Sequence, residues 1–167
     1  MNSSFFERCA DCLLCCWCGS GHLQIILCSH EAERISAAGM SITGYEILIG
    51  AGQCCPFLGD DGCILTGDLR PIHCRLYPLL YVRNGSICID LSCGFSDEYV
   101  IQAGRSGSPA HRHLIEMASE LEKLTEKDRA RLARWSEKVT DKLVLVPPGD
   151  LSIMNCNNAI NHRKYPV

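Results

Sequence analysis

The cysteines near the start of the chain are the residues whose type and spacing point most directly to chemistry. The stretch from Cys9 to Cys18 reads CADCLLCCWC and holds five cysteines in ten residues. Within it, Cys9, Cys12 and Cys15 are each separated by two residues, so one tight turn can direct several sulfurs to one point. Thiolates are the liganding form of cysteine, and all-sulfur sites suit zinc and iron–sulfur centres. This run therefore predicts a thiolate metal site.

A second group of cysteines lies between Cys54 and Cys74, in a segment rich in Gly, Pro and Asp. Glycines permit the tight backbone that repeated ligation requires. Arg70 and Arg75 flank Cys74 and would offset the negative charge of a four-thiolate centre. The alternative is that these arginines form surface ion pairs with the nearby aspartates, which are Asp60, Asp61 and Asp68. Four histidines are weaker ligand candidates because thiolates are in excess: His30, His73, His111 and His113.

The composition limits the class of protein. The chain has 167 residues, is 47% hydrophobic, carries a net charge of −3 and contains 13 cysteines. The acidic start does not resemble a secretory signal, and the cysteine count is odd, so metal thiolates are favoured over a disulfide scaffold. The chain lacks a basic block that would predict nucleic-acid binding. No apolar run approaches the roughly 20 residues of a membrane span. The simplest expectation is a cytoplasmic, reducing location.

Capping residues and apolar periodicity predict the secondary structure. Candidate caps and helical spacing indicate helices near residues 30–38, 44–50, 109–124 and 125–143. The dipeptide Asn84-Gly85 separates two strand-like segments, 79–83 and 86–90, and predicts a two-residue hairpin turn. Residues 53–78 are expected to be loops. The last helix is expected to continue the apolar stripe through Leu143.

These signals predict an α+β fold, a small, cysteine-rich, loop-rich and metal-stabilised domain with short helices, one β-hairpin and a C-terminal helical pair. The expected organisation is a cysteine-cluster metal-binding domain over residues 1–103, the helical pair over 104–146 packed on it, and a polar tail over 147–167. The apolar stripes of the pair are best explained as packing surfaces. Docking of a protein partner is the alternative.

The order of these motifs resembles the YkgJ-type cysteine-cluster family, described as a putative zinc- or iron-chelating domain, whose pattern also occurs in the flagellin lysine N-methylase. The resemblance covers roughly residues 5–95. It rests on CxxCxxCC at Cys9–Cys16, on Cys55-Pro56-Phe57-Leu58 and Gly62-Cys63-Ile64, and on Arg70-Pro71, Cys74-Arg75 and Tyr77-Pro78. Leu13 departs from the family pattern, in which a glycine usually follows the second cysteine.

The cysteines that match the family, together with Cys93, form the expected ligand set of eight, which suffices for two four-sulfur sites: Cys9, Cys12, Cys15, Cys16, Cys55, Cys63, Cys74 and Cys93. The remaining five are expected to be spare: Cys18, Cys28, Cys54, Cys88 and Cys156. The first run has the spacing of three ligands in bacterial ferredoxins, which favours an iron–sulfur cluster of the 4Fe-4S type. Zinc is the alternative, because four thiolates satisfy either metal.

Three functions are compatible with these features. The first is a metal-binding protein whose site is structural or stores metal or electrons. The second is an iron–sulfur-dependent enzyme or subunit related to the protein lysine N-methylase; no glycine-rich nucleotide loop or catalytic residue is evident, and turnover of S-adenosylmethionine would identify it. The third is an interaction module in which metal staples the fold and the C-terminal helices dock a protein partner. The first needs nothing beyond the cysteines and is favoured.

Overall fold

The computed structural model describes residues 16, 23–37, 39–65, 69–139 and 142–145. These ranges contain five helices and seven strands. The helices are α2 (Ser29–Ala37), α3 (Ile72–Leu76), α4 (Ser96–Ala103), α5 (Pro109–Lys123) and α6 (Glu126–Ser136). The strands are β1 (Leu23–Ile26), β2 (Glu46–Ile49), β3 (Leu58–Gly59), β4 (Gly62–Cys63), β5 (Leu79–Tyr81), β6 (Ile87–Asp90) and β7 (Lys142–Leu145). The α+β expectation is confirmed.

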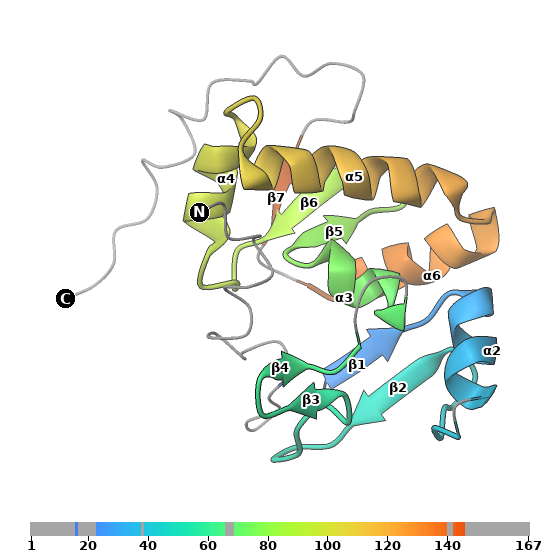
Figure 1. Ribbon diagram of the computed structural model, residues 1–167. Helices are drawn as coiled ribbons and strands as arrows, with labels where there is room; N and C mark the ends of the chain where they lie inside the picture. The colour runs from blue at the N-terminus through green and yellow to red at the C-terminus, as the bar shows by residue number, and fades with distance from the viewer. Residues whose placement is uncertain (1–15, 17–22, 38, 66–68, 140–141, 146–167) are drawn as a thin grey trace.

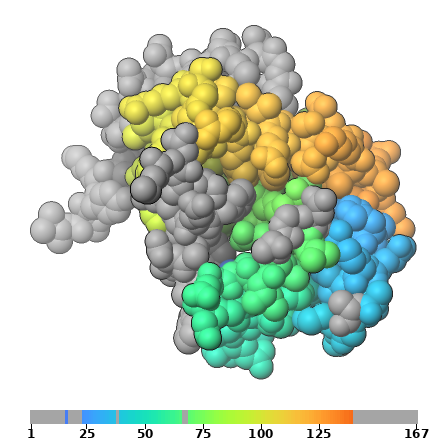
Figure 2. Space-filling model, in the orientation of Figure 1, coloured from blue at the N-terminus to red at the C-terminus, as the bar shows by residue number. Residues whose placement is uncertain are grey.

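All strand pairs are antiparallel and form three small sheets, β1-β2, β3-β4 and β5-β6-β7. The expectation of one hairpin is therefore too simple. In Figure 1, β1 to β4 and α2 lie in the lower part, β5 to β7 with α4 and α5 lie in the upper part, and α3 lies between them. Figure 2 shows the same division on the surface, with α4 and α5 in yellow and orange above the blue and teal residues.

Two hydrophobic clusters correspond to these two parts. The helical core contains Tyr99, Met117, Leu132 and the buried residues of α3, β5 and β6. The cysteine core contains the buried residues Ile25, Leu27, Ala32, Ile35, Ile47, Ile49, Cys55 and Phe57, with Cys16, Cys63 and Cys74 packed against them. Alternate side chains of a strand point to opposite faces, so β1 and the residue after it serve both clusters, with Ile26 in the helical core and Ile25 and Leu27 in the cysteine core.

Helix α2 forms close to where its sequence predicts. Gly39 adopts φ +83° just after the helix, and its N–H donates to the Ser36 carbonyl at 2.9 Å, so the expected glycine stop is confirmed. At the other end, the Glu31 carboxylate accepts a hydrogen bond from the Cys28 N–H at 2.8 Å, which is half of a capping box. The caps of α5 and α6 are also as expected, since Ser108 and Thr125 accept hydrogen bonds from backbone N–H groups three residues onward.

Two expected helical segments are strands instead. Residues 46–49 pair with β1, with Ile25 opposite Ile47, because a short apolar run gains more from cross-strand packing than from a single helical turn. The second C-terminal helix ends at Ser136, and Leu143 lies in β7, opposite Ile89 of β6. The helix expected over residues 44–50 is therefore wrong. The expected extension of the last helix to residue 143 is wrong as well.

The hairpin at Asn84-Gly85 is confirmed, but its turn differs from the expected one. Strand pairing ends at Tyr81 and Ile87, and Val82 N–H donates to the Ser86 carbonyl at 3.0 Å. Three residues therefore form the loop, and Gly85 takes the left-handed conformation at φ +85°, as in a type I turn followed by a glycine bulge. None of the helices in the described part of the chain is both long and apolar enough to cross a membrane.

Candidate thiolate site

Cys16 and Cys55 meet in the cysteine core although 38 residues separate them in the chain. The Cys55 N–H donates to the Cys16 carbonyl at 2.8 Å, and the two thiol side chains are close enough to shift each other's pKa. That sulfur contact, assisted by the nearby Arg70 guanidinium and opposed by burial, lowers the pKa of Cys16 to about 7. The same contact and burial raise the pKa of Cys55. The two thiols therefore titrate as an interacting pair, and the Arg70 charge favours the ionised form of Cys16.

Cys63 and Cys74 complete a group of four sulfurs. Cys63 ends β4, next to the hairpin turn, and Cys74 lies in α3. The pKa of Cys74 is raised to about 12, chiefly by burial; the charges of Cys63 and Cys16 add to this effect and the charge of Arg70 opposes it. Cys74 also interacts electrostatically with Cys55. Four of the eight expected ligands are therefore neighbours in one small region of the fold.

The two arginines that flank Cys74 in the sequence have different roles. The positive charge of Arg70 stabilises the thiolate forms of both Cys16 and Cys74, which is the role expected of a guanidinium beside a thiolate site. Arg75 instead lies 3.7 Å from Glu120 of α5. Arg70 therefore acts on the charges of the cysteines, whereas Arg75 forms an ion pair on the helical side of α3.

Two buried hydrogen bonds and one partly buried hydrogen bond hold α3 and with it Cys74. The Glu31 carboxylate accepts from the Ile72 N–H at 2.7 Å, and His73 Nδ1 accepts from the Ile26 N–H at 2.7 Å. On the far side, His113 Nε2 lies 2.7 Å from the Arg75 carbonyl oxygen. Such fully satisfied buried polar groups fix one arrangement, so the position of Cys74 is set by α2, β1 and α5 together.

The histidines are used by the fold. His113 Nδ1 lies 2.8 Å from the Tyr99 hydroxyl, so both of its ring nitrogens have hydrogen-bond partners. Burial lowers the pKa of His113 and lowers that of His73 to about 4. His73 also packs edge-on against Trp135, with ring centroids 4.2 Å apart. His111 Nδ1 lies 3.0 Å from the Ala103 carbonyl, and His30 is exposed on α2.

The remaining expected ligands divide into two groups. Cys93 lies in the turn between β6 and α4, where its N–H donates to the Asp90 carbonyl at 3.3 Å. Cys9, Cys12 and Cys15 lie outside the described residues, as do the expected spare cysteines Cys18 and Cys156. Of the other spare cysteines, Cys54 is exposed, Cys28 and Cys88 are buried, and burial together with the Glu31 charge raises the pKa of Cys28.

The donor chemistry of the four gathered cysteines suits a soft metal, because all four are sulfurs and a guanidinium lies beside them. Within the described ranges, however, no three His, Cys, Asp or Glu side chains are arranged to hold a metal ion. The group of four is therefore a cluster of interacting thiols. A closed tetrahedral site would require further sulfurs or a small rearrangement of these four.

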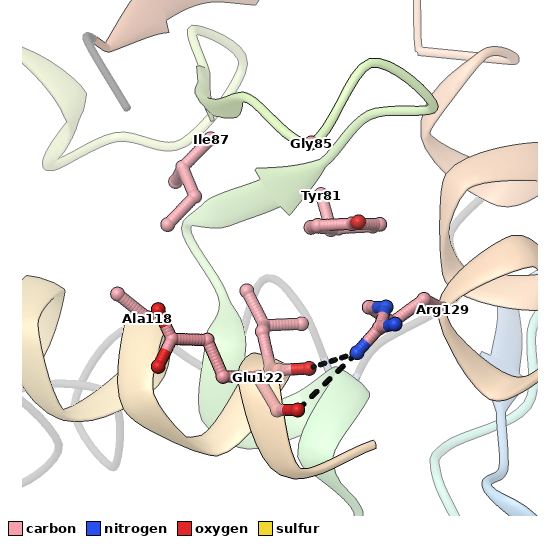
Figure 3. Close-up of a pocket in the computed structure, with 7 residues that line it drawn as sticks. Tyr81, Gly85, Ile87, Ala118, Glu122 and Arg129 are labelled. Carbon is pink, nitrogen blue, oxygen red and sulfur yellow. Dashed lines mark hydrogen bonds between the residues drawn. The ribbon is translucent and has the colours of Figure 1, made fainter. Parts of the chain in front are cut away.

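A pocket of about 250 Å³ lies between the β5-β6 hairpin and α5. Figure 3 shows Tyr81, Ile87 and Ala118 around it, with Arg129 at its rim. Arg129 Nη1 donates to three carbonyl oxygens at the end of α5, the shortest being Leu124 at 2.8 Å. Since this guanidinium caps a helix, the pocket has an apolar wall and a structural cation, and its groups do not form an obvious reactive centre.

Comparisons of this chain with models of protein families, with curated proteins and with solved structures found no match. Its function is therefore inferred from its own residues. The role of Glu31 in holding α3 was not predicted. The segment Cys28-Ser29-His30-Glu31 does contain a signal for it. A glutamate three residues after a helix-capping position is typical of a capping box; here the same carboxylate also anchors the helix that carries Cys74.

Proposed function

We propose that this chain is a metal-binding cysteine-cluster protein. In this proposal Cys16, Cys55, Cys63 and Cys74 share thiolate sites with the CxxCxxC run at Cys9, Cys12 and Cys15 and with Cys93. The observation that carries the proposal is the gathering of four of these sulfurs beside Arg70, from segments far apart in the sequence. The resemblance to the YkgJ-type family agrees with it.

The electrostatics of the four sulfurs support the proposal. The pKa values of Cys55 and Cys74 are raised by burial and by neighbouring sulfurs, so several thiolates cannot coexist there without a compensating cation. One guanidinium offsets one charge. A divalent metal or an iron–sulfur cluster would supply the rest, because a coordinated thiol loses its proton outright and metal binding is coupled to proton release.

We favour an iron–sulfur centre over zinc because the Cys9, Cys12 and Cys15 spacing matches three consecutive ligands of bacterial ferredoxins. The biological role in this proposal is structural, or storage of metal or electrons, in the reducing cytoplasm. When bound, the cluster would supply electron-transfer capacity. The chain's own contribution is to hold the sulfurs, to exclude water from Cys55 and to offset their charge with Arg70.

The test is metal content per chain in single cysteine-to-serine variants. We expect Cys55→Ser and Cys74→Ser to lose most of the bound metal, and Cys54→Ser to keep it. Cys54 is a matched control, because it is adjacent in sequence but exposed. Equal metal content in the Cys54 and Cys55 variants would show that the gathered sulfurs are not ligands.

A further inference from the structure

The Cys16–Cys55 pair has the geometry of two thiols that can be joined. A 2.8 Å backbone hydrogen bond links the two residues, and both side chains pack in the cysteine core. Such a bond holds two residues close together, and disulfides span roughly 4.4–6.8 Å between Cα atoms. A bond between the sulfurs therefore requires side-chain rotation and little backbone movement.

We infer that Cys16 and Cys55 form a reversible redox site, in which a small disulfide such as oxidised glutathione converts the two thiols to a protein disulfide. The inference rests on the proposed function in one respect: both sulfurs are proposed ligands, so the disulfide form cannot hold metal through them. Oxidation would then release metal, and reduction would restore the site.

The two residues are suited to the two successive steps of the exchange. Cys16 is more exposed than Cys55, so a small disulfide reaches its sulfur first. Once that sulfur has lost its proton to solvent, it attacks one sulfur of the small disulfide and expels one glutathione thiolate, which gives a mixed disulfide. Cys55 is buried against Cys16. After losing its proton to solvent, it attacks the Cys16 sulfur and expels the second glutathione thiolate. Two protein thiols and one small disulfide thus become one protein disulfide and two small thiols.

The neighbouring cysteines are less suited to this chemistry. Cys74 lies on a helix that hydrogen bonds from Glu31, His73 and His113 hold in place. Cys54 is adjacent to Cys55 but exposed, and adjacent cysteines differ in the direction of their side chains in an extended segment. The hydrogen-bonded pair is therefore the one we expect to react first.

The experiment uses the full chain as purified, equilibrated with oxidised and reduced glutathione. Free thiols are alkylated, and the protein is cleaved with trypsin. Because cleavage after Arg34 separates Cys16 from Cys55, a disulfide between them keeps two peptides joined and adds no alkyl group at either sulfur. We expect the joined peptide in the wild type and in Cys54→Ser, and its loss in Cys16→Ser and Cys55→Ser.

Three outcomes would overturn the inference: joined peptides that persist in Cys55→Ser, joined peptides that disappear in Cys54→Ser, or full alkylation of both cysteines in the oxidising buffer. The metal content of the same preparation, measured before the glutathione treatment, tests the proposed function independently. A chain that carries metal but never forms the disulfide refutes the redox inference alone. A chain that forms the disulfide but never carries metal refutes the proposed function alone.

Discussion

The helical core and the cysteine core bury their side chains in different ways. The helical core is filled by large side chains that are fully buried, among them Tyr99, Met117 and Leu132, and helices α3 to α6 and strands β5 and β6 contribute to it. The cysteine core rests on two-stranded sheets and one helix, and sulfurs from four separate segments pack on it. An isolated two-stranded sheet is marginally stable, so the cysteine core depends on its packing against α2 and, in the proposed function, on bound metal.

The two cores share their connecting elements. Ile72 and Leu76 of α3 lie in the helical core, whereas Cys74 on the same helix lies in the cysteine core. Strand β1 divides its side chains in the same way. Loss of one core should therefore disturb the other through α3 and β1. Four changes to the protein test how the two cores differ.

The largest effect is expected from metal removal, because structural metal binding contributes on the order of 10 kcal/mol in small zinc domains. A chelator, or Cys74→Ser, should unfold the cysteine core while α5 and α6 partly persist. Hydrogen exchange measured by mass spectrometry should show lost protection in residues 46–65 and residual protection in residues 109–136. Retained protection of 46–65 after complete metal loss, relative to Cys54→Ser as the matched control, would contradict the account.

A smaller effect is expected from Asp128→Ala, which breaks a buried link between the two cores. Asp128 of α6 accepts hydrogen bonds from the Ser29 N–H at 3.0 Å and from Arg131, whose guanidinium lies 3.5 Å from the Tyr45 ring centre. Removing one partner of a buried ion pair typically costs about 3–5 kcal/mol. Chemical denaturation should report this loss, and Glu137→Ala, which breaks an exposed pair with Arg83, should cost about 0–1 kcal/mol.

Gly85→Val should cost about 1–2 kcal/mol, the penalty of a left-handed conformation for a residue with a side chain. Gly85 has φ +85° and no atom within 4 Å of an added Cβ, so the cost is conformational and not steric. Gly85→Asn, which tolerates this conformation better, is the control. Denaturation midpoints that are equal for the two variants would show that the hairpin loop does not need its glycine.

The effect that is smallest at neutral pH concerns His113 of the helical core. Burial lowers its pKa in the folded protein, so the unfolded chain binds the extra proton first as the pH falls. The contribution of His113 to the free energy of unfolding is complete above the ordinary histidine pKa of about 6.5. This contribution is lost as the pH falls through the pKa of His113 in the folded protein. His73 acts in the same direction.

His113→Gln should therefore flatten the acid side of the stability–pH curve without removing its slope entirely. The measurement is the denaturation midpoint at several pH values between about 7 and 5, starting above the ordinary histidine pKa. His30→Gln, on the exposed surface of α2, serves as the control and should leave the slope unchanged. Identical slopes for wild type and His113→Gln would contradict the assignment.

Local signals predicted those elements whose ends are set by nearby residues. The caps at Ser108 and Thr125 and the stop at Gly39 are of this kind. The segment at 46–49 failed because its strand depends on β1, more than twenty residues away, and the strand at Leu143 depends on β6. Non-local pairing leaves no short-range signal by which a strand is separated from a short apolar helix.

The sequence pointed to the four cysteines of the candidate site, but less clearly to the residues that hold them in position. Spacing and resemblance selected Cys16, Cys55, Cys63 and Cys74, and the structure brings these four together. The hydrogen bonds that position α3 come from Glu31, His73 and His113. These three contacts follow from the tertiary arrangement, so a single sequence does not reveal them.

The most direct test of the account is the metal and sulfide content of the full chain, prepared without oxygen from iron-replete cells. The account predicts brown protein with broad visible absorption, bound iron and acid-labile sulfide, all lost in Cys55→Ser and retained in Cys54→Ser. Colourless protein with stoichiometric zinc would keep the thiolate site and reverse the choice of metal. A folded, fully reduced protein with neither metal, and with both cores protected from hydrogen exchange, would contradict the central claim.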